Sequence, residues 1–180
     1  MKTYKLKVAG LERDLPIIKI SDALSIASFV ILGDQELTTK SAKELDKLIP
    51  DVDIFVTAEA KGIPLVHELS RLRNMKKYVV CRKSVKSYMK DSIEVSLKSI
   101  TTANSQKLYL NGEDVGLIKG KEVCLVDDVI STGQSSKALE ELINKAGGIV
   151  VARAAILAEG EAYKRDDIIY LSPLPLNPEK

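Results

Sequence analysis

The sequence predicts an α/β protein in which a central parallel sheet is flanked by helices. Two continuous apolar runs, Asp53–Thr57 and Val123–Val126, are typical of strands that are buried on both faces. Amphipathic segments lie between the apolar runs, and strand, helix and strand follow one another at spacings of about 20–25 residues. This alternation indicates right-handed βαβ units, in which ligands are held beyond the carboxyl ends of the strands.

The individual elements follow from local patterns. Seven further segments have the composition of strands, and the fourth and fifth of them are expected to form a hairpin: Tyr4–Val8, Leu15–Ile20, Tyr78–Cys81, Ile93–Ser99, Lys107–Leu110, Ile149–Leu157 and Ile168–Leu171. Four segments are expected to be helices, of which the first is apolar on most faces and the others are amphipathic: Asp22–Leu32, Thr38–Ile49, Gly62–Arg73 and Ser135–Lys145. The tail after the last strand is rich in proline and is not expected to be helical.

The composition is that of a soluble globular protein. Of the 180 residues, 45% are hydrophobic and 29% are charged, which excludes disorder for the bulk of the chain and indicates a single domain over residues 1–180. A net charge of +2 is too small to indicate a nucleic-acid partner, and neither a secretory leader nor a membrane span is recognisable. We therefore expect a cytoplasmic protein, with Cys81 and Cys124 as buried free thiols.

The segment with the clearest chemistry joins an apolar strand to a helix. Asp127 and Asp128 end the strand, and a run of small polar residues precedes the helix. Backbone N–H groups at a helix N-terminus bind phosphate, and the two carboxylates can bind sugar hydroxyls or a cation. These residues predict a site for a phosphorylated sugar; the alternative is a simple turn in which Ser135 caps the helix. The small polar residues are Ser131, Thr132, Gly133, Gln134 and Ser135.

The run from Val123 to Ser135, VCLVDDVISTGQS, resembles the phosphoribosyl pyrophosphate (PRPP) signature of type I phosphoribosyltransferases. The resemblance implies that Asp127 and Asp128 hold the ribose and a PRPP-bound Mg²⁺, and that residues 131–135 hold the 5′-phosphate. It also implies a small hood formed by about residues 1–20 and 158–180. Gln134 stands where the family usually has glycine, and in this it resembles the xanthine enzymes.

A second strand–helix junction, Thr57–Pro64 (TAEAKGIP), resembles the pyrophosphate loop of the purine enzymes. The resemblance implies that the charge of Lys61 and the neighbouring backbone amides face pyrophosphate. It also implies that the peptide bond between Glu59 and Ala60 can be cis. An ordinary strand–helix turn is the alternative. The residues expected at pyrophosphate from this loop are Glu59, Ala60, Lys61 and Gly62.

Three cations, Arg82, Lys83 and Lys86, follow the strand that ends at Cys81. They are compatible with a solvated turn. The purine enzymes have a matching Arg-Lys pair that approaches pyrophosphate, in some members across a dimer interface, and so we expect these three residues at pyrophosphate and the protein as a homodimer.

The next segment, about residues 84–110, resembles the mobile loop that closes over PRPP. It lacks the Ser-Leu-Glu-Tyr-Gly stretch of many adenine enzymes, which leaves Glu94 as a substitute candidate for the loop glutamate. By the same family resemblance, the expected base contacts in the hood are Ile18, Lys19 and Leu171.

Together these segments predict a purine phosphoribosyltransferase of purine salvage, with Asp127, Asp128 and Lys61 as its catalytic residues. The arm Gly10–Ile17 favours adenine as the base. TAEAKGIP and the stretch Leu108–Gly112 resemble archaeal hypoxanthine-type members, and Gln134 leans to xanthine. Adenine leads, with hypoxanthine/guanine or xanthine as alternatives. A pyrimidine enzyme and a non-catalytic PRPP-sensing regulator remain further alternatives.

Overall fold

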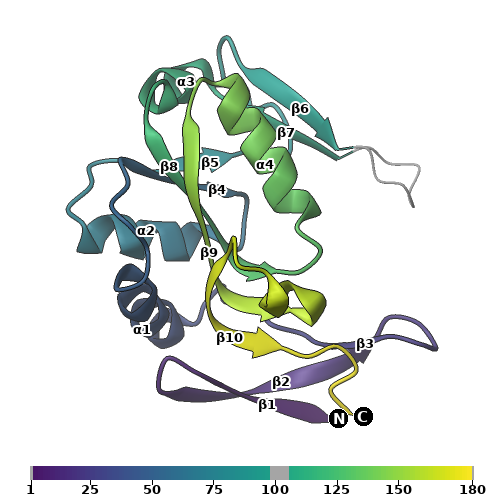
Figure 1. Ribbon diagram of the computed structural model, residues 1–180. Helices are drawn as coiled ribbons and strands as arrows, with labels where there is room; N and C mark the ends of the chain where they lie inside the picture. Colours follow the sequence, from purple (N-terminus) through teal and green to yellow (C-terminus); the bar gives the residue numbers. More distant parts are fainter. Residues whose placement is uncertain (1, 98–105, 180) are drawn as a thin grey trace.

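The computed structural model describes residues 2–97 and 106–179 and is built around a five-stranded parallel sheet (Figure 1). The strand order is β10-β9-β8-β4-β5, and the sheet confirms the predicted α/β class. Because all five strands are parallel, their carboxyl ends point to the same edge of the sheet, where the candidate site lies. The strands are β4 (Ile54–Ala58), β5 (Val79–Cys81), β8 (Glu122–Ile130), β9 (Ile149–Glu159) and β10 (Ile169–Leu174).

Helices cover both faces of the sheet. Helices α1 (Gln35–Asp46) and α2 (Ile63–Leu72) lie on one face, and α4 (Gln134–Lys145) lies on the other (Figure 1). The antiparallel hairpin of β6 (Ile93–Leu97) and β7 (Gln106–Leu110) packs beside α4. The residues between the two hairpin strands, 98–105, lie outside the described residues, and the last two residues of the expected strand Ile93–Ser99 fall among them.

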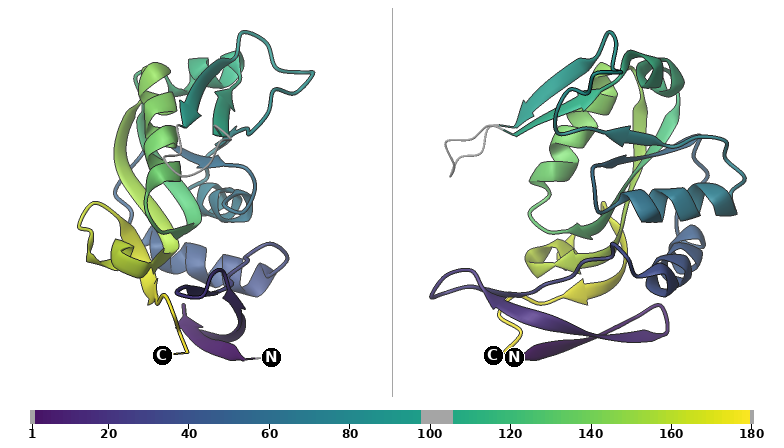
Figure 2. Two further views of the ribbon diagram at one scale, coloured as in Figure 1. Left: turned by 90° about the vertical axis from the view of Figure 1, so that its right-hand side faces the viewer. Right: turned by 180° about the vertical axis from the view of Figure 1, so that it is seen from behind.

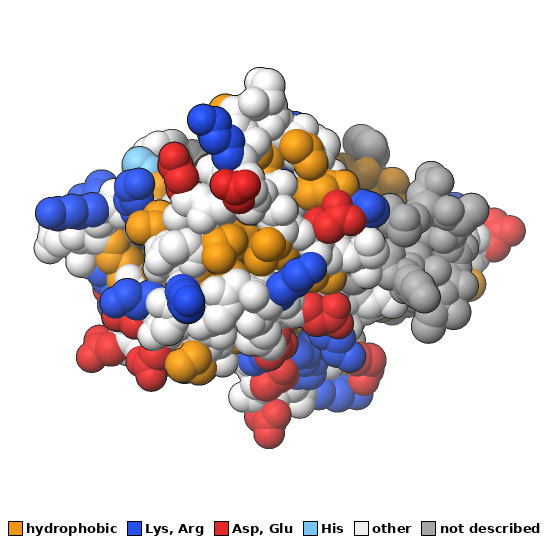
Figure 3. Space-filling model, turned by 90° about the horizontal axis from the view of Figure 1, so that it is seen from above, with side chains coloured by type: hydrophobic (Ala, Val, Ile, Leu, Met, Phe, Trp, Pro, Cys, Tyr) orange, Lys and Arg blue, Asp and Glu red, His pale blue; other side chains and the backbone are white. Residues whose placement is uncertain are grey.

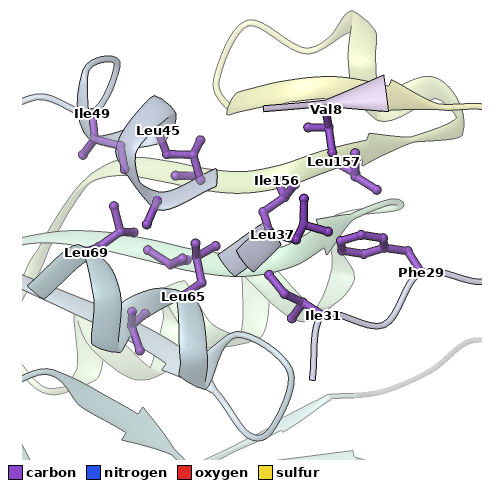
Figure 4. Packing of buried hydrophobic residues seen from close by; sticks show 14 of the residues in the cluster. Val8, Phe29, Ile31, Leu37, Leu45, Ile49, Leu65, Leu69, Ile156 and Leu157 are labelled. Carbon is purple, nitrogen blue, oxygen red and sulfur yellow. The ribbon is translucent and has the colours of Figure 1, made fainter. Parts of the chain in front are cut away.

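The core beneath α1 and α2 is made of large aliphatic side chains (Figure 4). Leu37 and Leu45 of α1 face Leu65 and Leu69 of α2 and Ile156 of β9, and each is no more than 1% exposed. Burial of one such side chain stabilises a fold by about 1.5–3 kcal/mol. This packing fixes α2, and with it the loop that precedes α2 at the edge of the sheet.

Three short strands at the chain's beginning form a separate antiparallel sheet: β1 (Thr3–Val8), β2 (Leu11–Lys19) and β3 (Ser25–Ala27). The C-terminal tail joins this sheet, since Leu176 forms a bridge with Ile26 and Asn177 accepts the Ser25 N–H at 2.9 Å. Both termini therefore lie together at this end of the molecule (Figure 2). We call β1–β3 and the tail the hood; it lies below the carboxyl ends of β8 and β9 in Figure 1.

The predicted helix over Asp22–Leu32 is wrong. The structure has β3 and extended chain there, in which buried and more exposed side chains alternate. A period of two indicates a strand, and the high apolar content of the segment concealed that period. The buried set is Ser25, Ala27, Phe29 and Ile31, and the more exposed set is Ile26, Ser28, Val30 and Leu32.

Other elements were predicted with displaced ends. Helix α1 begins three residues before the expected Thr38, because the side chain of Asp34 caps it by accepting the Leu37 N–H at 3.0 Å. Strand β8 continues through the two carboxylates, and β2 begins four residues before the expected Leu15. Helix α3 (Gly112–Ile118) and a 3₁₀ turn (Gly160–Lys164) were not predicted.

On the face seen from above in Figure 3, basic and acidic side chains are interspersed with hydrophobic ones. In the part of the chain that the structure describes, no helix is long and apolar enough to cross a membrane. Cys81 and Cys124 are buried free thiols, as predicted.

Candidate active site

The turn between β8 and α4 forms a small polar hollow of about 70 Å³. Gly133, with φ of +80°, is the N-cap of α4, and its carbonyl accepts the Lys137 N–H at 2.9 Å. The N–H groups of the intervening residues precede the first intrahelical bond, and a helix N-terminus offers such groups to an anion. The hollow can therefore hold a phosphate group. All five residues predicted to hold the 5′-phosphate line it: Ser131, Thr132, Gly133, Gln134 and Ser135.

Asp127 and Asp128 lie beside this hollow, inside strand β8. Asp128 is 1% exposed, and Asp127 is half-buried and lines the hollow. Each carboxylate accepts a backbone N–H: Asp127 from Asp128 at 2.8 Å, and Asp128 from Val129 at 2.9 Å. Burial, together with the charge of Asp128, raises the pKa of Asp127 to about 7. The pair is a buried acidic centre that favours a hydroxyl donor or a cation.

A cation from the β4–α2 loop reaches this centre. The Lys61 ammonium lies 3.3 Å from Asp128 Oδ2, and its charge opposes the rise in the pKa of Asp127. The Lys61 side chain is 46% exposed, so it also meets solvent at the mouth of the site. The peptide bond between Glu59 and Ala60 is cis, which is the conformation that the resemblance implies can occur there.

The loop approaches the sheet closely at Gly62. A Cβ at this position would lie 2.1 Å from Thr57 Oγ1 and 3.1 Å from the carbonyl oxygen of Val126. Any larger residue would require the buried Thr57 side chain to move and would press on the Val126 carbonyl, whereas glycine has no Cβ. Gly62 therefore sets the position of the residues just before it.

The turn that follows β5 is attached to the same loop by Glu59. One oxygen of its carboxylate accepts the Lys83 backbone N–H at 2.7 Å, and the other forms an ion pair with Arg82 Nε at 3.0 Å. Arg82 is held in addition by backbone hydrogen bonds of 2.8 Å in both directions with Tyr109 of β7. The structure thus brings Arg82 and Lys83 to the pyrophosphate loop, with the charge of Lys83 exposed.

Two further candidates lie apart from this group. Lys86 donates its ammonium to the neighbouring Ser84 hydroxyl at 2.7 Å. Glu94 lies in β6 and pairs with Lys107 across the hairpin at 2.7 Å, which lowers its pKa. Among the described contacts, neither residue touches the carboxylates of β8.

The expected base contacts lie in two places. Ile18 and Lys19 belong to β2, where Lys19 forms an ion pair with Asp22 at 2.7 Å and lines a hollow of about 330 Å³ between the hood strands and the tail. Leu171 belongs to β10 and packs against the core cluster beneath α1. No described contact joins Leu171 to the two hood residues.

A larger hollow, of about 480 Å³, lies between α1 and α2, away from the carboxylates. His67 and Tyr78 line it and stack edge to face, with ring centroids 5.9 Å apart.

Sequence reasoning missed two residues beside the site. Glu159 ends β9, and Arg165 follows the 3₁₀ turn after it. A Cβ added at Gly133 would lie 2.3 Å from Arg165 Nη1, so this guanidinium packs directly on residues 131–135. We call these residues the phosphate turn, after their predicted role. Asp167 holds Arg165 there by two hydrogen bonds of 2.8 and 2.7 Å. Neither residue belongs to a local motif, and only the tertiary fold brings them to the site.

Comparisons with known proteins agree with this geometry. Residues 32–175 match the phosphoribosyl transferase domain family. A hypoxanthine/guanine phosphoribosyltransferase of Methanotorris igneus is 37% identical over 145 residues, which is 81% of this chain and 73% of that protein. The corresponding protein of Ferroglobus placidus is 40% identical over 115 residues, or 64% of this chain and 57% of that protein.

Solved structures support the same fold. The adenine phosphoribosyltransferase of Thermoanaerobacter pseudethanolicus superposes with a TM-score of 0.70 over 88% of this chain and 95% of its own, at 19% identity. The family match spans most of the chain, and the parallel sheet, the acidic pair and the phosphate turn lie within it. The chain therefore belongs to the phosphoribosyltransferase family and has the type I fold.

Proposed function

We propose that the protein is a purine phosphoribosyltransferase of purine salvage, which transfers 5-phosphoribosyl from PRPP to a ring nitrogen of a purine and releases pyrophosphate. One observation carries the proposal: a phosphate-sized hollow, two carboxylates and Lys61 meet at the carboxyl edge of the sheet. The relatives of 37% and 40% identity, both named as hypoxanthine/guanine phosphoribosyltransferases, support it.

Each part of the site then has a role. The N-terminus of α4 binds the 5′-phosphate, and Asp127 and Asp128 hold the ribose hydroxyls. Lys61, with Arg82 and Lys83, neutralises the charge of the leaving pyrophosphate while the ribose carbon gains oxocarbenium character. Catalysis in this proposal comes from fixing two reactants and from electrostatic stabilisation, so no covalent intermediate is required.

The site also fits Mg²⁺ that arrives with PRPP. Mg²⁺ prefers carboxylate oxygens and keeps several waters, and Asp128 Oδ2 is a buried oxygen that accepts no hydrogen bond from the described residues. Asp127 and Asp128 would hold the ion, directly or through water. When bound, Mg²⁺ supplies positive charge to the pyrophosphate group.

The choice of base rests on different support. The relatives above favour hypoxanthine or guanine, whereas the adenine enzymes match at 19% identity and support the fold alone. The sequence preference for adenine, drawn from the N-terminal arm, stays a prediction. We further propose a cytoplasmic homodimer, in which the exposed Lys83 turn lies near the subunit boundary.

One assay tests the function. The protein is incubated with PRPP, Mg²⁺ and adenine, hypoxanthine, guanine or xanthine separately, and pyrophosphate release is followed. Release with at least one purine is expected, and the double variant Asp127→Asn with Asp128→Asn should abolish it while circular dichroism remains unchanged. PRPP binding without release for any base would instead favour the non-catalytic PRPP-sensing regulator. Absence of PRPP binding would refute both functions.

A further inference from the structure

A third carboxylate, that of Glu159, lies where the hood meets the central sheet. Glu159 is the last residue of β9, and its register partner is Leu174 of β10. The next residue, Gly160, packs against Leu176, because an added Cβ would lie 2.9 Å from Leu176 Cδ1. Leu176 in turn bridges to Ile26 of β3. Glu159 thus lies beside β10, and the residue that follows it contacts the tail, which is bridged to β3.

The Glu159 carboxylate lacks a hydrogen-bond donor. It is half-buried, and no hydrogen bond or ion pair joins it to another residue in the described ranges 2–97 and 106–179. Burial raises its pKa, and the charge of Lys61, which is close enough to act on it, opposes the rise. By contrast, the nearby carboxylates Glu161 and Asp167 are paired with Lys164 and Arg165. Because this carboxylate is half-buried and has no described protein donor, a ligand that supplies a hydrogen-bond donor and excludes water there gains affinity.

The position of Glu159 relative to the phosphate turn indicates which part of a ligand it meets. Strand β9 runs beside β8, and Ala158 lies opposite Ile130, the residue that precedes the phosphate turn. If the phosphate of a nucleotide occupies that turn and its ribose lies at Asp127 and Asp128, the position of its base remains to be assigned. Glu159 ends β9 at this same edge of the sheet, next to the strand that leads into the phosphate turn.

We propose that Glu159 is a specificity-determining residue that accepts a hydrogen bond from the ring N1–H of a 6-oxopurine. This inference rests on the proposed function and deepens it by naming the base. Guanine presents N1–H and a 2-amino group side by side, so both carboxylate oxygens gain a donor. Hypoxanthine presents N1–H alone. Adenine presents a lone pair at N1, which a carboxylate repels. The order of preference is therefore guanine, hypoxanthine, adenine.

The test measures dissociation constants of GMP, IMP, AMP and ribose 5-phosphate by calorimetry for the wild type and Glu159→Leu. The variant should bind GMP about tenfold or more weakly, because a lost hydrogen bond to a charged group leaves the N1–H unpaired. IMP should lose less, AMP should bind unchanged or more tightly, and ribose 5-phosphate should bind unchanged. Glu161→Leu, which removes the same charge from an 81% exposed side chain two residues away, is the matched control and should change none of the four.

A second variant keeps the test decisive if Glu159→Leu unfolds. Glu159→Gln preserves the size and one carbonyl acceptor, so it should retain IMP binding and lose the preference for GMP over IMP. Equal weakening of GMP and AMP by either variant would overturn the proposal. The proposal would also be overturned if the variants changed the binding of ribose 5-phosphate or pyrophosphate but left the ratio of the GMP and AMP dissociation constants unchanged. Glu159 would then act through the charge of Lys61.

Failure of this inference differs from failure of the proposed function. If wild-type protein releases pyrophosphate with a purine but the variants leave base preference unchanged, only the role of Glu159 is refuted. If the wild type binds none of the four ligands and turns over no base, the proposed function itself is refuted.

Discussion

The Lys61 ammonium lies 3.3 Å from a carboxylate oxygen of Asp128, and so the β4–α2 loop and strand β8 are joined by an ion pair. Asp128 is 1% exposed, whereas the lysine side chain is 46% exposed. The cation is therefore the partner that can turn outward. Arrival of pyrophosphate would supply it with stronger negative charge, and Asp128 would be freed for the ribose or for Mg²⁺.

Lys61→Ala should weaken the binding of PRPP and pyrophosphate much more than that of a nucleoside monophosphate, because the nucleotide lacks the pyrophosphate group that Lys61 is proposed to face. A hydrogen bond to a charged group contributes about 1.5–3 kcal/mol, which corresponds to roughly 10–100-fold in the dissociation constant. Calorimetry with each ligand measures the difference. Lys76→Ala removes an exposed lysine before β5 and should change nothing. Equal weakening of all ligands by Lys61→Ala would assign Lys61 a structural role.

The raised pKa of Asp127 makes the stability of the ligand-free protein depend on pH. Because the pKa rises from 3.8 to about 7 on folding, the protonated form is favoured in the folded state, and this stabilisation is lost as pH increases from about 4 to 7. Asp127→Asn keeps the acceptor for the Asp128 N–H but cannot ionise. Its melting temperature should therefore exceed that of the wild type at pH 8, by on the order of 2–4 °C per kcal/mol, and the difference should shrink toward pH 4.

Asp167 provides the control of opposite sign. The guanidinium of Arg165 lowers its pKa, so its contribution to stability is present at neutral pH and is lost as pH falls below its ordinary value near 3.8. Asp167→Asn should lower the melting temperature at pH 8, modestly because the side chain is 44% exposed. If the wild type and Asp127→Asn had the same melting temperature at every pH, the raised pKa of Asp127 would be contradicted.

Gly62→Ala should destabilise the protein by about 1–3 kcal/mol, because the added methyl group would overlap Thr57 Oγ1 and press on the Val126 carbonyl. Gly116→Ala is the matched control, since its Cβ would meet nothing within 4 Å and it lies in α3. Alanine there should stabilise the helix by about 0.5–1 kcal/mol. Urea unfolding measures both, and equal free energies of unfolding for the two variants would show that the loop can move away from the sheet.

Local sequence signals were sufficient for the parallel sheet and the phosphate turn. The runs at Asp53–Thr57 and Val123–Val126 are mostly apolar because both faces of those strands are covered, and polar residues follow each run. Asp127, Asp128 and Lys61 were predicted as site residues because they follow such runs, although the structure keeps the two carboxylates inside β8 and places only Lys61 in a loop. Their mutual contact follows from the strand order, in which β4 and β8 are neighbours.

Tertiary contacts decided what the sequence could not. The segment Asp22–Leu32 is apolar enough for a helix, and only pairing with β2 and the tail selects the extended form. Arg165 and Glu159 reach the site from the region after β9, where no residue spacing points to the phosphate turn or to Lys61. The contacts of the Glu59 carboxylate with Arg82 and Lys83 likewise depend on β4 and β5 lying side by side.

The two contacts of the Glu59 carboxylate predict a role in positioning Arg82 and Lys83. Glu59→Ala should release the turn after β5, because both the ion pair with Arg82 and the acceptor for the Lys83 N–H are lost. Two charge-bearing contacts to pyrophosphate would then be poorly placed, and its dissociation constant should rise about tenfold. Glu59→Gln keeps an acceptor for the Lys83 N–H but not the ion pair, and its effect should be smaller.

Hydrogen exchange separates positioning from simple charge. The Lys83 amide should exchange faster in Glu59→Ala than in the wild type, and Glu59→Gln should retain most of the protection. If Glu59 acted only by its negative charge, both variants would bind pyrophosphate more tightly, since repulsion of the ligand would be removed. Tighter binding with unchanged protection of Lys83 would therefore exclude the positioning role, whereas weaker binding that follows the loss of protection would establish that Glu59 holds the two cations in place.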